Sequence, residues 1–240
     1  MNKFRFDVLT LLPKSFELMS ELGVIGRALE KKIAELHVHN PRDFTKDNYH
    51  KVDDEPYGGG PGMVLKPEPF FHAFASVPKC TKRRVLMMTP QGHPLTQRDL
   101  WRWSKNTEQL IFLCGQYEGF DERIRTLADE EISLGDFVLT GGELAAMTII
   151  NGVLRLLPGT LGAEASLLEE SYSDLLLEHP HFTRPAEFYG MPVPQVLRSG
   201  NHAEIAKWRQ DQRILRTKER RPDAYKRWIA KNNDTTFDFF

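Results

Sequence analysis

The sequence predicts an α/β domain built on a mostly parallel sheet, followed by a linker and a small all-α domain. Short apolar runs that end in turn residues alternate with segments of helical periodicity, a rhythm typical of α/β folds. The chain's 240 residues are enough for one large domain and a small partner. We expect the α/β domain at residues 1–160, the linker at 161–176 and the helical domain at 177–240.

Strands and helices are expected in turn along the first domain. The predicted strands are residues 4–12 and the runs LHVHNP, RRVLMMTP, QLIFLCG and EISLGDFVL. The predicted helices begin at Pro13 and span 24–34, 96–105 and 121–128. The stretch GGELAAMTIINGVLRLLPG is apolar almost all round, so we expect a helix buried in a core or against another subunit.

The second domain is predicted from two helical patterns. Asn201, with Glu204 three residues later, resembles a capping box, and Ile205, Trp208 and Leu215 share one face. A further helix is expected after Pro222. Residues 207–231 hold ten Lys and Arg against three Asp and Glu, a net charge of +7 that leaves −8 for the rest of a chain of net charge −1. This asymmetry indicates a polyanion such as nucleic acid, and a solvated helical face is the alternative.

Composition narrows the class of protein. No stretch approaches the ~20 apolar residues of a membrane span, and the N-terminus lacks the features of a signal peptide. The two cysteines, Cys80 and Cys114, have no CxxC partner or nearby histidine, which argues against disulfide and zinc frameworks. We therefore expect a soluble protein of the reducing cytoplasm.

Glycine and proline crowd the stretch from Pro56 to Met63. It fits neither the GxGxxG fingerprint nor the GxxxxGK[ST] phosphate loop. Glycines let a backbone approach a ligand closely, whereas the alternative is a tight surface turn.

Three loops with similar composition follow predicted strands: TPQG, CGQYEGFDER and LGDFVLTGGEL. Ligands of α/β sheets bind beyond the carboxyl ends of the strands, so these loops predict a pocket. Within them Glu118 is either a site carboxylate or an exposed partner of Arg123.

Two further residues are candidates for chemistry. Asp174 lies in the irregular segment, where it is either a general base or the N-cap of a short helix. Arg155 ends an apolar helix, where burial of its charge calls for an anionic partner.

Together these motifs resemble the bacterial tRNA (guanine-N1)-methyltransferases, the TrmD type of the SPOUT superfamily. NPRDFTKDNYHKVDDEPYGGGPGMVL, the three loops, RLLPGTLG and PHFTRP stand in the family's order over essentially the whole chain. The resemblance implies a deep trefoil knot around residues 86–92, 113–119 and 133–145, in which S-adenosylmethionine binds bent. It also implies an obligate homodimer with a composite active site, and a dependence on magnesium whose ligands we do not assign.

The resemblance further implies transfer of a methyl group to N1 of guanine 37, immediately 3′ of the anticodon in tRNA. Asp174 aligns with the base, Arg155 with the arginine that stabilises charge on O6, and Glu118 with a carboxylate near the donor. Donor binding is implied for Met88, Pro90, Gln91, Leu113, Gly115, Tyr117, Glu118, Ile132, Leu134, Gly135, Phe137, Leu139, Gly141, Gly142 and Ala145. Substrate contacts are expected from Tyr57, Gly58, Gly59, Gly60 and Pro61 to the base, and from Lys207, Arg209, Arg213 and Arg216 to phosphates.

Three positions depart from the family's pattern. Leu175 follows Asp174 where glycine is usual, Gln116 stands where arginine is common and Phe137 where tyrosine is common. The departure at Leu175, together with the basic C-terminal segment, leaves open a noncatalytic RNA-binding protein of the same fold. A methyltransferase acting on another RNA is a third alternative.

Overall fold

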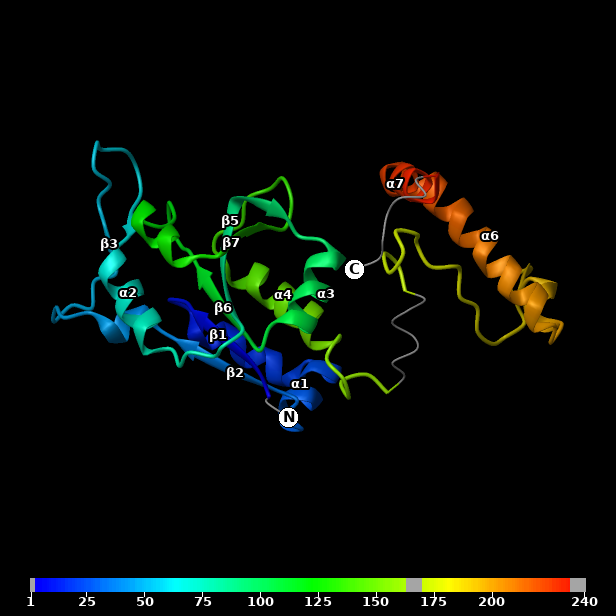
Figure 1. Ribbon diagram of the computed structural model, residues 1–240, viewed down its shortest axis with the longest axis horizontal. Coiled ribbons are helices and arrows are strands. Elements are labelled where there is room, and N and C mark those ends of the chain that lie inside the picture. The colour runs from blue at the N-terminus through cyan, green and yellow to red at the C-terminus, as the bar shows by residue number, and fades with distance from the viewer. Residues whose placement is uncertain (1–2, 163–169, 234–240) are drawn as a thin grey trace. The chain divides into compact units, whose positions relative to one another are not determined.

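The chain forms two compact units, residues 1–162 and 163–240, in a computed structural model that describes residues 3–162 and 170–233. The first unit is α/β and the second is mostly helical (Figure 1). The predicted linker overlaps the second unit: residues 163–169 lie outside the described residues, and residues 170–176 make contacts within that unit.

The first unit is built on five parallel strands in the order β2-β1-β6-β5-β7. Their bounds are Phe4–Leu9 for β1, Ala34–His39 for β2, Arg83–Pro94 for β5, Gln109–Cys114 for β6 and Glu130–Ser133 for β7. Each overlaps a predicted strand, and the parallel pairing brings the carboxyl ends of the strands to one edge of the sheet.

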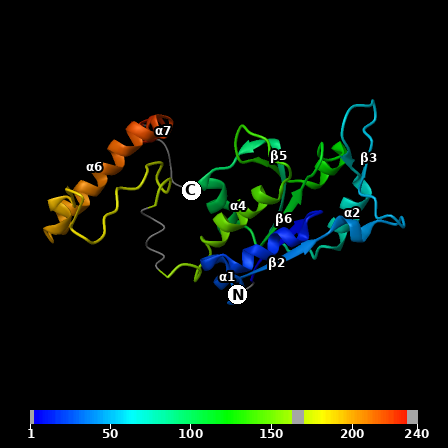
Figure 2. The ribbon, with the colours of Figure 1, turned by 180° about the vertical axis from the view of Figure 1, so that it is seen from behind.

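Helices cover both faces of this sheet (Figures 1 and 2). On one face lie α1 (Gly23–Glu30), α3 (Gln97–Asn106), α4 (Glu143–Leu154) and the 3-10 helix η1 (Pro13–Glu21). On the other lie α2 (Pro67–Ser76) and the 3-10 helix η3 (Glu122–Leu127), with a further 3-10 turn, η2, at Pro41–Phe44. Because side chains alternate along β6, Leu110 and Phe112 enter the first core while Ile111 and Leu113 enter the second.

The three segments for which a knot is predicted touch one another through glycines. The Gly142 amide donates to the Gly115 carbonyl at 3.0 Å. A Cβ on Gly142 would lie 2.8 Å from Cys114 Cα and 2.9 Å from Met88 Cβ. The chain that follows β7 is therefore packed against the ends of β5 and β6 with no room for a side chain at this position.

Helix α4, expected to be apolar all round, is buried largely by its own unit. Eight of its twelve residues are buried. The exposed side chains Leu144, Thr148 and Asn151 form a narrow stripe, with spacings of four and three residues. Most of the apolar surface of α4 is thus accounted for without a second subunit.

The second unit contains α6 (His202–Arg220), α7 (Pro222–Asn233) and the 3-10 turn η4 (Gln195–Arg198). It also contains a short hairpin of β8 (Glu187–Phe188) and β9 (Met191–Pro192). Asn201 caps α6 by accepting from the Glu204 amide at 3.4 Å, which is one half of the predicted capping box; the Asn201 amide donates to the Ser199 hydroxyl at 3.1 Å. The expectation that Leu215 shares a face with Ile205 and Trp208 is wrong, since Leu215 is 46% exposed whereas the other two are half-buried. The buried face passes instead through Arg213 and Thr217, where residues 170–177 pack.

Asp7, in the middle of β1, is a fully buried carboxylate. It accepts hydrogen bonds from Arg5 at 2.7 Å, from Gln109 at 2.8 Å and from His39 at 2.8 Å. Burial raises the pKa of Asp7, but these hydrogen bonds outweigh burial and hold the pKa at about 2, below the ordinary 3.8. The ionised form therefore stabilises the fold at neutral pH.

Because this pKa is lower in the folded chain, the stabilisation is present above pH 4 and is lost as pH falls toward 2. We expect Asp7→Asn to reduce the free energy of unfolding at pH 7 by about 3 kcal/mol, the cost of leaving Arg5 without its buried partner. Urea unfolding of Asp7→Asn and of the unchanged chain at pH 7 and pH 3 measures this loss of free energy, which should be smaller at pH 3. Glu35→Gln, which removes an exposed ion pair with Lys3, is the control and should leave the free energy of unfolding nearly unchanged.

Candidate active site

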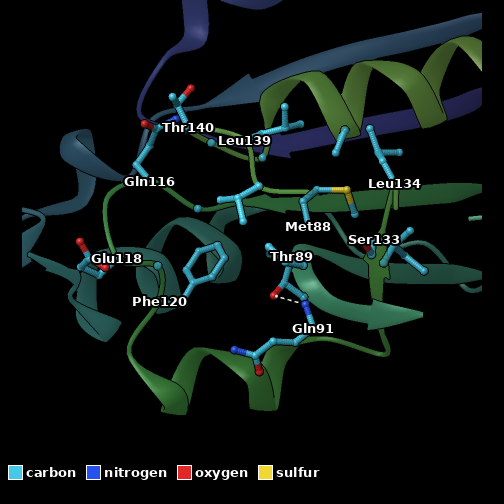
Figure 3. Close-up of a pocket in the computed structure, with 18 of the residues that line it drawn as sticks. Met88, Thr89, Gln91, Gln116, Glu118, Phe120, Ser133, Leu134, Leu139 and Thr140 are labelled. Carbon is cyan, nitrogen blue, oxygen red and sulfur yellow. Dashed lines mark hydrogen bonds between the residues drawn. The ribbon is translucent and has the colours of Figure 1, made fainter. Parts of the chain in front are cut away.

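A cavity of about 320 Å³ lies at the carboxyl edge of the sheet, between the irregular segment of β5 from Met88 to His93, the loops that follow β6 and β7, and the start of α4 (Figure 3). All of the residues predicted to bind the donor line it, except Leu113 and Gly135. The side chain of Leu113 is instead part of the core on the α2 face, because the alternation along β6 turns it away.

Several residues that line the cavity were not predicted to do so: Thr89, Gln116, Gly119, Phe120, Arg125, Ser133, Val138 and Thr140. All of them except Ser133 and Arg125 fall within the three loop motifs. Ser133 ends β7, and Arg125 lies on η3. The motifs were therefore a sufficient signal for most of these residues, whereas Arg125 reaches the cavity only through the tertiary fold.

The cavity has two chemically different sides. Figure 3 shows Gln116 and Glu118 on one side and Ser133 and Leu134 on the other. At the rim, Arg125 donates to Gln91 Oε1 at 2.9 Å and pairs with Glu131. The hydrogen bond to Glu131 raises the pKa of Arg125, so the guanidinium stays charged. The cavity thus combines apolar side chains such as Leu134 with the Glu118 carboxylate and the Arg125 guanidinium.

Glu143, in the first turn of α4, fixes the loop that follows β6. Its Oε1 accepts from the Thr10 hydroxyl at 2.5 Å and its Oε2 accepts from Gln116 Nε2 at 2.8 Å. Glu143 and Thr10 are both buried. Nearby, burial and the charge of Glu143 raise the pKa of the Cys114 thiol well above its ordinary value. Cys114 is therefore unsuited to act as a nucleophile.

The glycine tract forms the tip of a hairpin between β3 (Asp53–Asp54) and β4 (Val64–Leu65). The hairpin is hydrogen-bonded through its backbone to the loop after β6: the Glu118 amide donates to Met63 O at 3.1 Å, and Leu65 N donates to Gly119 O at 2.9 Å. A Cβ on Gly62 would lie 2.7 Å from Glu118 Cδ. The neighbour that comes so close to this tract is therefore the Glu118 side chain.

The other glycines of the tract serve its backbone conformation. Gly58, Gly59 and Gly60 have φ of 91°, 77° and 124°, and nothing lies within 4 Å of a Cβ at any of them. Tyr57 and Pro61 are exposed beside them, so the predicted substrate loop presents backbone groups to the outside. The alternative interpretation of Glu118, as an exposed ion-pair partner of Arg123, finds no support, since Arg123 pairs with Asp121 at 2.8 Å.

Arg155 follows the last residue of α4 and is half-buried. The cavity lies at the other end of this helix, where Gly142 and Ala145 line it. Twelve helical residues separate the two ends by about 18 Å, more than an arginine side chain spans. Arg155 therefore does not reach the cavity of its own chain.

Asp174 belongs to the second unit, and its side chain is 47% exposed. Its carboxylate pairs with Arg213 and accepts from the Leu176 amide at 3.2 Å. No helix begins at Asp174, so the alternative of an N-cap is wrong. Leu175 has φ of 77°, in the left-handed region that favours the glycine usual here in the family.

Leu175→Gly is expected to leave the unfolding free energy unchanged or raised by up to about 1 kcal/mol, because relief of the left-handed strain offsets the lost side chain. The control is Leu177→Gly, whose side chain is also half-buried but whose φ is not positive. It should cost about 2 kcal/mol. Thermal unfolding of both variants measures the difference, and equal destabilisation would contradict the role assigned to strain.

The four basic residues predicted to contact phosphates differ in availability. Lys207 and Arg209 are exposed on α6, Arg216 is half-buried, and Arg213 is engaged with Asp174.

Among the described residues no group of three His, Cys, Asp or Glu could hold a metal ion, so these side chains do not form a magnesium site of that kind. Within residues 3–162 and 170–233, no helix is both long and apolar enough to cross a bilayer.

Comparison with known proteins supports a single family. Residues 4–227 match the pattern of the family described as tRNA (Guanine-1)-methyltransferase TrmD. A tRNA (guanine-N(1)-)-methyltransferase of Synechococcus sp. (strain WH7803) is 69% identical, covering 98% of both chains. One of Synechococcus sp. (strain CC9311) is 67% identical with the same coverage, and one of Thermosynechococcus vestitus is 56% identical over 95% of this chain and 96% of its own. The chain therefore belongs to the tRNA (guanine-1)-methyltransferase TrmD family and has its knotted SPOUT fold.

Proposed function

We propose that this chain transfers a methyl group from S-adenosylmethionine to N1 of the guanine immediately 3′ of the anticodon, guanine 37 of tRNA. The observation that carries the proposal is the cavity lined by the three loop motifs, in a chain that belongs to this family. A tRNA substrate also implies that the protein works in the cytoplasm.

The cavity fits the proposed donor. Ile132, Leu134 and Ala145 supply apolar surface suited to an adenine ring, and the Glu118 carboxylate stands on the opposite side. When bound, S-adenosylmethionine supplies an electrophilic methyl group on a positively charged sulfur. A carboxylate near a cationic sulfur contributes favourable electrostatic energy. No step is assigned to magnesium.

The chemistry at guanine requires a base and an anion-stabilising group. N1 carries a proton near neutral pH, so it becomes nucleophilic only when that proton is removed. The Asp174 carboxylate accepts the N1 proton, and Arg155 stabilises the negative charge that spreads to O6. The freed N1 electron pair then forms the bond to the methyl carbon as the carbon–sulfur bond breaks, which leaves a thioether product.

A homodimer explains how Arg155 takes part. The length of α4 keeps Arg155 away from the cavity of its own chain, so a cavity completed by a second copy is the arrangement that brings the groups together. Exposed leucines support such an interface: Leu12, Leu18 and Leu22 lie on or beside η1, which packs against α4, where Leu144 is exposed. Exposed apolar groups on adjoining elements are typical of subunit contacts.

The glycine hairpin is proposed as the surface on which the target base rests. Its tip offers backbone amides and carbonyls, and Met63 and Leu65, at the other end of the hairpin, are hydrogen-bonded to the loop that carries Glu118. A base that leaves the anticodon stack could therefore lie beside the donor. The exposed Lys207 and Arg209 of α6 would hold tRNA phosphates.

Methyl transfer from labelled S-adenosylmethionine tests the proposal. The substrates are an unmodified tRNA with guanine after the anticodon and the same tRNA with adenine at that position. We expect label only in the guanine tRNA, at N1. Binding of both tRNAs without transfer would favour the noncatalytic alternative, and transfer to both, or only to another RNA, would assign a different target.

A further inference from the structure

Arg213 holds the carboxylate of Asp174, a contact that the proposed function does not use. From the sequence, Arg213 was expected to contact tRNA phosphates. We propose instead that Arg213 is a positioning residue. It fixes residues 170–177, the Asp174 loop, on α6, so that the helix that binds tRNA also holds the general base Asp174. This inference rests on the proposed role of Asp174 as the base.

The surroundings of Arg213 argue against a phosphate contact. Its side chain is only 13% exposed, whereas that of Asp174 is 47% exposed. One terminal nitrogen pairs with Asp174 and the other donates to Gln210 at 3.2 Å. Its Nε is buried and has no hydrogen-bond partner among the described residues. The guanidinium thus faces into the unit, where a phosphate has little access.

The ion pair is one of three attachments between the Asp174 loop and α6. The Thr217 hydroxyl accepts from the Leu177 amide at 2.9 Å and donates to the Arg213 carbonyl at 2.6 Å. Just past the end of α6, Arg221 donates to the Tyr172 hydroxyl at 2.5 Å. Arg213, Thr217 and Arg221 are spaced by four residues, so they lie along one face of the helix.

These contacts orient the Asp174 carboxylate relative to α6. Leu176, two residues beyond Asp174, is fully buried, and its carbonyl accepts from the Tyr172 amide at 2.8 Å. The Asp174 side chain also accepts from the Leu176 amide, so it is held from two directions. Because misplacement of a catalytic group by about 1 Å can cost about 100-fold in rate, loss of the Arg213 contact affects turnover rather than tRNA affinity.

Steady-state kinetics with tRNA as the varied substrate test this inference. We expect Arg213→Ala to lower kcat by about 10- to 100-fold with less than a threefold change in KM for tRNA. Arg213→Lys, which keeps the charge, should recover part of the loss. The comparison variant is Arg209→Ala, on the exposed face of α6, which should act mainly by raising KM for tRNA. A rise in KM without a fall in kcat for Arg213→Ala would overturn the inference.

A double-mutant cycle separates positioning from a general structural role. If Arg213 acts through Asp174, adding Arg213→Ala to Asp174→Ala should lower the residual kcat no further. An additive loss, or a lower melting temperature that accounts for the fall in kcat, would overturn the inference. The outcome for Asp174→Ala alone distinguishes the two proposals: full activity there removes the proposed base, whereas an inactive Asp174→Ala beside a normal kcat for Arg213→Ala removes only the positioning role.

Discussion

Replacing Asp174 with alanine is expected to slow methyl transfer to tRNA by about 10²- to 10⁴-fold, the contribution typical of a general base. The reason lies in the substrate, since N1 of guanine is a poor nucleophile while it holds its proton. The exposed carboxylate is free to meet a substrate on one side while Arg213 and the Leu176 amide hold it on the other. Single-turnover transfer of labelled methyl groups measures the effect.

Donor binding should survive the Asp174→Ala change, because Asp174 does not line the cavity that we assign to the donor. Calorimetric titration with S-adenosylmethionine checks this point. Asp211→Ala removes another exposed carboxylate, on α6, and is the matched control; its rate should stay close to that of the unchanged chain. Full activity of Asp174→Ala would show that another group removes the N1 proton.

Gly92→Ala should destabilise the first unit by about 3 kcal/mol or more. Gly92 lies where β5 meets β7, and a Cβ there would come within 2.5 Å of Glu131 O and close to the backbone nitrogen of Ile132. These are backbone atoms of a sheet, which cannot turn aside as a side chain would. The added methyl group would also displace the loop that carries Pro90 and Gln91, so donor binding should weaken with stability.

The control for this experiment is Gly162→Ala, a glycine without positive φ and with nothing within 4 Å of the added Cβ. Urea unfolding of both variants should show a loss for Gly92→Ala and a change below about 0.5 kcal/mol for Gly162→Ala. Equal stability of the two variants would mean that the sheet adjusts at this point without cost.

The strands of the sheet could be predicted because strands buried on both faces are continuous apolar runs, such as QLIFLC in β6. The cavity followed from the same reasoning, since parallel strands deliver their loops to one edge. Helix α2 was not predicted, because its sequence PEPFFHAFAS begins with two prolines and lacks a clear periodicity. Two segments expected to be helical, after Pro13 and at 121–128, are 3-10 turns, a distinction that apolar spacing does not make.

The contacts that were missed depend on tertiary structure. Nothing in the local sequence indicates that Arg213 meets Asp174, 39 residues earlier, because ion pairs between distant segments leave no periodic signal. The pairing of the glycine hairpin with residues 118–121 was missed for the same reason. The φ of 77° at Leu175 was not predicted either, although it is a conformation that the glycine usual at this position adopts readily.

The glycine hairpin and the loop that carries Glu118 are joined by backbone hydrogen bonds, which do not depend directly on side-chain identity. Amides and carbonyls of Met63, Leu65, Glu118 and Gly119 join the two loops whatever side chains they carry. A change of side chain at the half-buried Met63 therefore leaves these backbone contacts in place, whereas Leu65 is buried in the core and Gly119 has a φ of 108°. Gly62 has no such latitude, because its φ of 86° lies in the left-handed region that favours glycine and the Glu118 side chain occupies the place of a Cβ.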